Sequence, residues 1–250
     1  MNNIPQSIKY LRTLLQTDFL VLLKNKRALI ISIVAPLYVI FITSRNAKST
    51  LGDPIFLIVL AITIGLLSTS ITGYALMLAR DRERGVFQRL RVTPAPTWTI
   101  MVSRLLVQTA ANLVIALIVL VIGSNIHNMT LNVDQYFEVL LVAILGGAVF
   151  LSIGQALVGL VRSAILVNSI GSLLYVALLL TGLLGPSGVL GSTIQNIAEW
   201  TPVGTVIAVF QGTLSQVAWD SQTWFSLLVC CGYIIVFTAI GIKWFRWDAR

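Results

Sequence analysis

Long apolar runs, separated by short polar stretches, dominate the pattern of this chain. Six such runs lie at 28–43, 54–78, 104–122, 139–161, 164–184 and 224–242. Apolar runs of about 20 residues are long enough to cross the hydrocarbon core of a bilayer as α-helices. The pattern therefore predicts six transmembrane helices. The first run would measure only roughly 24 Å as a helix, so the flanking Lys26 and Arg27 must reach the membrane surface or the bilayer must thin.

Three stretches outside these runs have patterns of their own. Residues 4–23 place apolar side chains at helical spacing, which predicts an amphipathic helix in the membrane interface; a solvated lead-in to the first span is the alternative. Arg162-Ser163 is the polar break at which the fourth and fifth runs must turn. Residues 185–221 are rich in Gly and Pro yet apolar in patches. They predict short half-helices that dip into the outer leaflet, with a plain outer loop as the alternative.

The composition agrees with a membrane protein. Of the 250 residues, 57% are hydrophobic and 10% are charged, whereas a soluble domain carries about 25% charged residues. The net charge of +8 could suggest nucleic acid. That interpretation fails, because the charges cluster between apolar runs as membrane topology requires. We expect a single all-α transmembrane domain over 1–250 that does not bind nucleic acid.

The distribution of cations predicts the orientation. With six spans both termini lie on one side, and that side would hold fifteen of the 17 Lys and Arg residues, against Arg45 and Lys48 on the other. Cytoplasmic loops carry such an excess of Lys and Arg. We therefore expect a multi-pass protein of the cell membrane with cytoplasmic N- and C-termini.

The sequence offers no chemistry of its own. It has one His, two adjacent cysteines (Cys230 and Cys231) within an apolar run, no phosphate-binding glycine loop and no spacing typical of metal ligands. We expect no catalytic, cofactor-binding or metal-binding residues, and any energy source must come from another subunit.

The segment 79–96 is the charged interruption between the second and third runs. It carries five arginines together with Asp81 and Glu83. From about Arg80 to Leu90 the pattern predicts a helix with Gly85 as its one breaker, in which Val86, Phe87 and Leu90 share a face. Thr93-Pro94-Ala95-Pro96 ends this helix and returns the chain to the membrane. A basic loop that only sets topology is the alternative to a docking surface.

The second run is unusually rich in small and hydroxyl residues. Such residues in a span indicate close helix packing or the wall of a pathway. The candidates for a substrate pathway are Thr63, Ser68, Thr69, Thr72 and Tyr74.

The residues from Arg82 to Pro94 closely resemble the E-R/K-G-T-L-E-R-L-R-x-T-P segment of ABC-2 type transporter permeases. The likeness is greatest to the branch that includes small drug, antibiotic and polysaccharide or glycolipid exporters. Trp200–Thr205 resembles the re-entrant outer segment of that family. Gln211-Gly212 departs from it, because members often carry an Arg-Gly pair there.

The resemblance implies the ABC-2, or type V exporter, fold and a non-catalytic subunit of an exporter for an amphipathic drug, lipid or lipid-linked glycan. It implies that the segment between spans 2 and 3 is a coupling helix seated in a cleft of a separate ATPase subunit, which holds the ATP and Mg²⁺. Phe87 and Leu90 would insert and the arginines would pair with acidic residues of the partner. The docking residues it implies are Arg82, Glu83, Arg84, Gly85, Val86, Phe87, Arg89, Leu90 and Arg91.

The resemblance further implies a dimer of permeases, of identical or related chains, with two ATPase subunits and the pathway between the permeases. Two other classes of function are the alternatives: a self-contained carrier and a membrane scaffold without transport. An ion-coupled carrier needs a carboxylate or His buried within its spans, and the predicted spans contain none.

Overall fold

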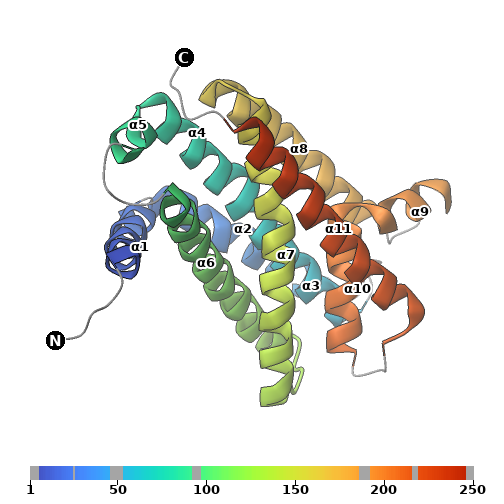
Figure 1. Cartoon of the computed structure of the whole chain (residues 1–250). Helices are drawn as coiled ribbons and strands as arrows, with labels where there is room; N and C mark the ends of the chain where they lie inside the picture. Colours follow the sequence, from blue (N-terminus) through green and yellow to red (C-terminus); the bar gives the residue numbers. More distant parts are fainter. Residues whose placement is uncertain are drawn as a thin grey trace.

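The computed structural model describes residues 6–24, 26–45, 53–91, 97–185, 192–215 and 219–245, and every regular element within these ranges is helical. The helices are α1 (Gln6–Lys24), α2 (Lys26–Arg45), α3 (Pro54–Leu67), the π-helix η1 (Ser68–Tyr74), α4 (Ala75–Glu83), α5 (Val86–Arg91), α6 (Thr97–Ile126), α7 (Val133–Leu160), α8 (Ala164–Leu184), α9 (Ser192–Trp200), α10 (Pro202–Leu214) and α11 (Ser221–Trp244). Figure 1 shows them as one bundle of long helices, with α1 lying across its flank.

Five helical runs in the described part of the chain are long and apolar enough to span a membrane. They are Pro54–Glu83, Thr99–Ile126, Val133–Leu160, Ala164–Leu184 and Ser221–Trp244. The chain is therefore a multi-pass membrane protein. The run expected at 28–43 lies in α2, whose described apolar part is the shorter segment Ser32–Ile42.

The third span begins earlier than the sequence suggested. Arg104 was expected at its cytoplasmic end, whereas α6 already begins at Thr97. Arg104 thus stands about two turns into α6, and it is 7% exposed. The sequence before Arg104 is polar, with Thr97 and Thr99, so the apolar pattern did not show that α6 begins about two turns earlier.

The run from α3 through α4 forms the centre of the bundle. It is the most buried of the five spans, and α2, α6, α7, α8 and α10 all pack against parts of it. Its start is fixed by Asp53, whose carboxylate accepts the backbone N–H of Ile55 at 3.1 Å, with Pro54 in the first turn. Asn132 and Gln135 form a capping box at the start of α7.

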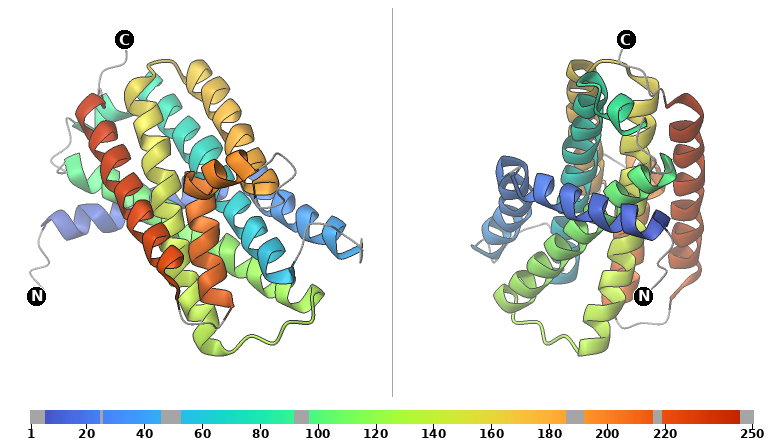
Figure 2. Two further views of the ribbon diagram at one scale, coloured as in Figure 1. Left: turned by 90° about the vertical axis from the view of Figure 1, so that its right-hand side faces the viewer. Right: turned by 60° about the vertical axis from the view of Figure 1, so that its left-hand side comes forward.

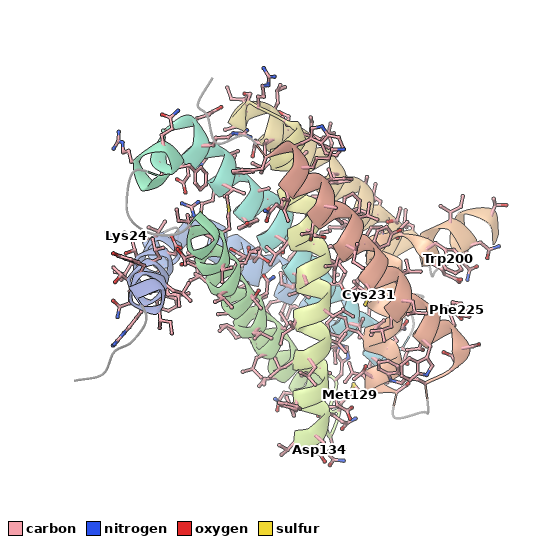
Figure 3. The ribbon with its side chains drawn as sticks, viewed as in Figure 1. Lys24, Met129, Asp134, Trp200, Phe225 and Cys231 are labelled. Carbon is pink, nitrogen blue, oxygen red and sulfur yellow. The ribbon has the colours of Figure 1, made fainter. Side chains whose placement is uncertain are left out.

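Two helices, α9 and α10, occupy the region that was expected to hold outer half-helices. Thr201 separates them and caps α10 by accepting the Gly204 N–H at 3.1 Å. The apolar face of α10, including Val206 and Phe210, is buried against α3, α7 and α11. Helix α9 is more peripheral, and Trp200 at its end is exposed (Figure 3).

The charges separate between the two ends of the bundle. Helix α5, the α7–α8 turn and the end of α11 lie at one end, whereas the start of α3, the α6–α7 loop and the start of α11 lie at the other (Figures 1 and 2). The described cations at the first end include Arg80, Arg82, Arg84, Arg89, Arg104, Arg162 and Lys243, and they outnumber Asp81 and Glu83 there. The acidic residues at the second end include Asp53, Asp134, Glu138 and Asp220, and Figure 3 labels Asp134 there.

Close packing between α7 and η1 predicts a sharp difference between two glycines. A Cβ atom at Gly154 would lie 2.8 Å from the Ser70 carbonyl oxygen, whereas a Cβ atom at Gly232 on α11 meets nothing within 4 Å. Gly154→Ala is expected to lower the free energy of unfolding by about 1–3 kcal/mol through overpacking. Gly232→Ala is expected to raise it by up to about 1 kcal/mol through better helix propensity. Thermal unfolding in detergent checks both, and equal effects would contradict the α7–η1 contact.

Candidate functional site

The charged segment between the second and third spans folds as two helices joined by a turn. Helix α4 continues the second span to Glu83, and α5 begins at Val86. Gly85 between them has φ = 67°, a left-handed conformation that glycine adopts without strain. The single helix expected from Arg80 to Leu90 is therefore wrong: it breaks at Gly85, the one breaker in the segment, and α5 sets off in a new direction.

Arg82 joins the end of α4 to the turn between α7 and α8. Its Nη1 donates to the Val158 carbonyl at 2.6 Å, and its Nη2 donates to the carbonyls of Val161 and Arg162 at 2.7 Å each. The last carbonyls of a helix lack partners within it and carry the negative end of the helix dipole. One guanidinium, 4% exposed, thus closes the C-terminal end of α7.

Glu83 holds the other side of the same turn. Its Oε1 accepts the backbone N–H of Ala164, the first residue of α8, at 2.6 Å. A carboxylate at a helix N-terminus satisfies an unpaired donor and complements the dipole. Neighbouring residues of opposite charge therefore fix both ends of the α7–α8 turn to α4. We call Arg82, Glu83 and this turn the α4 clamp.

Phe87 of α5 lies inside the chain. Its side chain is 0% exposed, and its ring meets Phe245, just after α11, edge-to-face at 5.7 Å between centroids. The Arg104 guanidinium lies 4.8 Å from the centre of the same ring, and its Nη1 is 2.7 Å from Asp81 Oδ2. The expectation that Phe87 would insert into a partner does not hold for this structure, because the end of α11 already covers it.

The exposed side of the α4–α5 segment is basic and polar. Arg84, Gln88 and Arg89 are exposed, Gly85 and Val86 are half-buried, and Glu83 is exposed apart from its bond to Ala164. The side chains of Leu90 and Arg91 lie outside the described residues. Of the docking residues expected from the sequence, Arg84 and Arg89 thus remain available to a partner, whereas Arg82 and Phe87 serve as internal anchors.

The expected pathway residues lie within the packed bundle. Thr63 and Thr72 donate to the carbonyls four residues before them, at 2.8 and 2.6 Å, and the Tyr74 hydroxyl donates to Gln155 Oε1 at 3.3 Å. Thr63, Ser68, Thr69 and Tyr74 are buried and Thr72 is half-buried. Tyr74 thus joins η1 to α7, whereas the hydroxyls of Thr63 and Thr72 bond within their own helical run. The assignment of these residues to a substrate pathway stays a prediction.

A polar contact between η1 and α6 was not anticipated from the sequence. Asn112 on α6 accepts from Thr69 Oγ1 at 2.5 Å and donates to Ser70 Oγ at 3.4 Å. Gln108, one turn earlier, donates to the Thr69 carbonyl at 3.4 Å. The signal was present, because Gln108 and Asn112 stand four residues apart on one face of an apolar helix. These bonds tie α6 to the π-helix, an irregularity that frequently marks functional segments.

Asp18 connects α1 to the same end of the bundle. Its Oδ2 accepts from Ser103 Oγ at 2.6 Å. Burial raises the pKa of Asp18 above its ordinary value; the Ser103 hydrogen bond and the nearby Arg104 oppose this rise, and Asp81 adds to it. The helix that was expected in the membrane interface is thus joined to α6 by a partly desolvated carboxylate.

The raised pKa of Asp18 predicts how stability depends on pH. Above the ordinary Asp pKa of 3.8 the unfolded chain loses this proton more readily than the folded one, so stability falls as pH rises towards the folded-state pKa. Asp18→Asn keeps a hydrogen-bond acceptor without the charge. The variant is expected to be more stable than the wild type at pH 7, with the gap closing as pH falls to 3.8. Melting temperatures across this range test it, and a wild type that is the more stable at pH 7 would refute it.

A cleft of about 590 Å³ opens between α6, α7 and α11. Its apolar lining comprises Met101, Leu105, Ala148, Leu151, Ile234, Ile242 and Phe245, and its polar lining comprises Thr109, Ser152, Gln155 and Thr238. Phe245 thus belongs both to this α6–α7–α11 cleft and to the packing around Phe87.

Comparison with known proteins identifies a family over most of the chain. The family model described as an ABC-2 type transporter matches residues 9–215, which run from α1 into the turn after α10 and include the whole α4–α5 segment. A search of curated proteins found no match.

Proposed function

The chain belongs to the ABC-2 type transporter family, as its non-catalytic transmembrane subunit, and on this premise we propose that it is the permease of an ATP-driven exporter. Its cargo would be an amphipathic molecule: a drug, a lipid or a lipid-linked glycan. The charged residues of the five long spans stand near the helix ends, and their central parts carry none. A pathway built from such spans suits a largely apolar cargo, because it offers no fixed counter-ion.

In the proposed topology α2 is the first of six spans and both termini are cytoplasmic. The separation of charge supports this, because the cationic end of the bundle carries α5 and the α7–α8 turn while the acidic end carries the α6–α7 loop. Helices α9 and α10 then form the re-entrant segment of the outer leaflet. Helix α1, which crosses the flank of the long helices in Figure 2, lies in the inner interface.

The α4 clamp is the observation that carries the proposed mechanism. We propose that an ATPase subunit, which holds ATP and Mg²⁺, docks on the exposed side of the α4–α5 segment through Arg84 and Arg89. Because α4 continues the central span and also holds the α7–α8 turn, a displacement of α5 is transmitted to three spans at once. Rigid elements that move together are the usual means of switching between two states.

The assembly would contain two permeases and two ATPase subunits, since one chain supplies half of a pathway with two-fold symmetry.

One experiment tests the function and shows whether the second permease is an identical or a related chain. The chain is cross-linked in its native membranes and isolated, and its partners are identified by mass spectrometry. An ATPase with a G-x-x-x-x-G-K-[ST] loop is expected in equal number, and ATP-dependent movement of a fluorescent amphipath in proteoliposomes is expected for the complex. Isolation of the chain without any such ATPase would refute the proposal.

A further inference from the structure

The α6–α7–α11 cleft lies apart from the segment that carries the proposed function. Its three walls are helices long and apolar enough to span the bilayer, which places the cleft at membrane depth. Figure 1 shows α6 and α11 on the two sides of α7, with α6 leaning away from α7 towards the end that carries α5. A volume of about 590 Å³ falls within the range of sites that hold small ligands.

The lining indicates what fills this space. Seven of its eleven side chains are apolar, and the four polar ones are uncharged. Gln155 stands five residues before the end of α7 and Thr238 six before the end of α11, which places them roughly 8–9 Å from these helix ends. The lipid ester groups lie at about this depth, between the hydrocarbon and the headgroups. Ser152 and Thr109 stand deeper, eight residues before the end of α7 and twelve after the start of α6. An apolar, uncharged groove with the Gln155 amide and the Thr238 hydroxyl at about ester depth matches an acyl chain and its ester carbonyl.

The cleft also adjoins the anchor of α5. Phe245 lines the cleft and packs edge-to-face on Phe87. Gln155 lines the cleft and accepts from Tyr74 on η1, the segment that leads into α4. An occupant of the cleft therefore touches two residues that contact the central span and α5 directly.

We propose that the α6–α7–α11 cleft binds one acyl chain of a bilayer phospholipid and that the bound chain stabilises the position of α5 through Phe245 and Phe87. Packing within folded proteins is as dense as in organic crystals, so an occupied cleft holds Phe245 against Phe87 and an empty one leaves the Phe245 ring unsupported on one side. The second half of the proposal, an effect on ATP hydrolysis, rests on the proposed function, whereas binding of the lipid does not.

The test uses the full chain in vesicles of phosphatidylcholine that carry a photoreactive diazirine on one acyl chain. After illumination the labelled peptides are identified by mass spectrometry. Peptides of α6, α7 and α11 that line the cleft are expected to be labelled at least fivefold above the exposed α8 peptide around Leu173, which reports ordinary lipid contact. Equal labelling of the two surfaces, or cross-linking of the cleft to a second copy of the chain, would overturn the proposal.

Two variants that fill the cleft from opposite walls complete the test. Ala148→Phe on α7 and Thr238→Phe on α11 are expected to lower labelling of the cleft at least fivefold. Ala177→Phe makes the same change at an exposed position of α8 and is expected to leave it unchanged. Thermal unfolding shows whether each variant folds. If one variant does not fold, the labelling of the other tests the site. Undiminished labelling in a folded Ala148→Phe or Thr238→Phe chain would refute the site.

The effect on α5 is measured in the complex with the ATPase. Ala148→Phe is expected to change the dependence of ATP hydrolysis on added phosphatidylcholine at least twofold, while Ala177→Phe is not. If Ala148→Phe removes the labelling of the cleft but leaves the dependence of ATP hydrolysis on phosphatidylcholine unchanged, the link through Phe245 is refuted. A chain that is labelled in the cleft but binds no ATPase would refute the proposed function and leave the lipid site standing.

Discussion

Arg82→Met is expected to lower the free energy of unfolding by about 3–5 kcal/mol. The wild-type guanidinium makes three hydrogen bonds to carbonyls at the α7–α8 turn, and a hydrogen bond to a charged group contributes about 1.5–3 kcal/mol. Methionine preserves most of the apolar volume but donates nothing, so the Val158 carbonyl near the end of α7 and the two carbonyls of the turn lose this donor at a largely buried place. Thermal unfolding in detergent, followed by tryptophan fluorescence, measures the loss.

Two further substitutions show that geometry, rather than charge alone, is responsible. Arg80→Met removes an exposed arginine two residues away on α4 and is expected to change stability by less than about 0.5 kcal/mol. Arg82→Lys keeps the charge but cannot reach three carbonyls with a planar fork, so roughly half of the loss is expected to remain. Equal effects of Arg80→Met and Arg82→Met would mean that the α4 clamp does not stabilise the fold.

The long-range nature of the clamp explains why the sequence could not predict it. Arg82 stands 76 residues before Val158, and the distance in sequence from Glu83 to Ala164 is 81. Arg82 and Glu83 both lie in a segment that resembles a docking motif. Such a resemblance suggests a role but does not show which residues the two side chains contact. The burial of Phe87 could not be predicted for the same reason, since Phe245, which covers it, comes from the other end of the chain.

Local patterns predicted much of the rest. Apolar periodicity located five spans to within several residues, because burial in lipid requires continuous apolar length. It placed the start of α6 seven residues late, since the sequence there is polar; the fold buries Thr99 and pairs Arg104 with Asp81. Gly85 was recognised from the sequence as a helix breaker. In the structure its positive φ ends α4, and α5 runs in a new direction.

The α4 clamp and the buried Phe87 together make the α4–α5 segment part of the bundle rather than a loop attached to it. Four elements meet there: the central span, the α7–α8 turn, the start of α6 through Arg104 and the end of α11 through Phe245. A partner that binds the outer side of α5 therefore acts on the bundle without inserting between its helices.

Because Phe87 is buried within the bundle, docking must be tested with the exposed residues of the α4–α5 segment. Phe87→Asp would bury a charge at a position that is 0% exposed, so loss of the ATPase could follow from damage to the fold alone. The combined change Arg84→Glu and Arg89→Glu reverses two exposed charges instead. Because like charges across an interface are repelled, the double variant is expected to bind the ATPase subunit at least tenfold more weakly, with an unchanged melting temperature.

The matched control reverses a charge at the same end of the bundle but outside α4–α5. Arg162→Glu changes an exposed side chain whose backbone carbonyl alone takes part in the clamp. If docking uses the α4–α5 surface, Arg162→Glu keeps most of the bound ATPase and of the ATP-dependent transport, while the double variant loses both. If the two variants weaken binding equally, the positive end of the bundle attracts the partner only by its general field, and the α4–α5 surface is not the docking site.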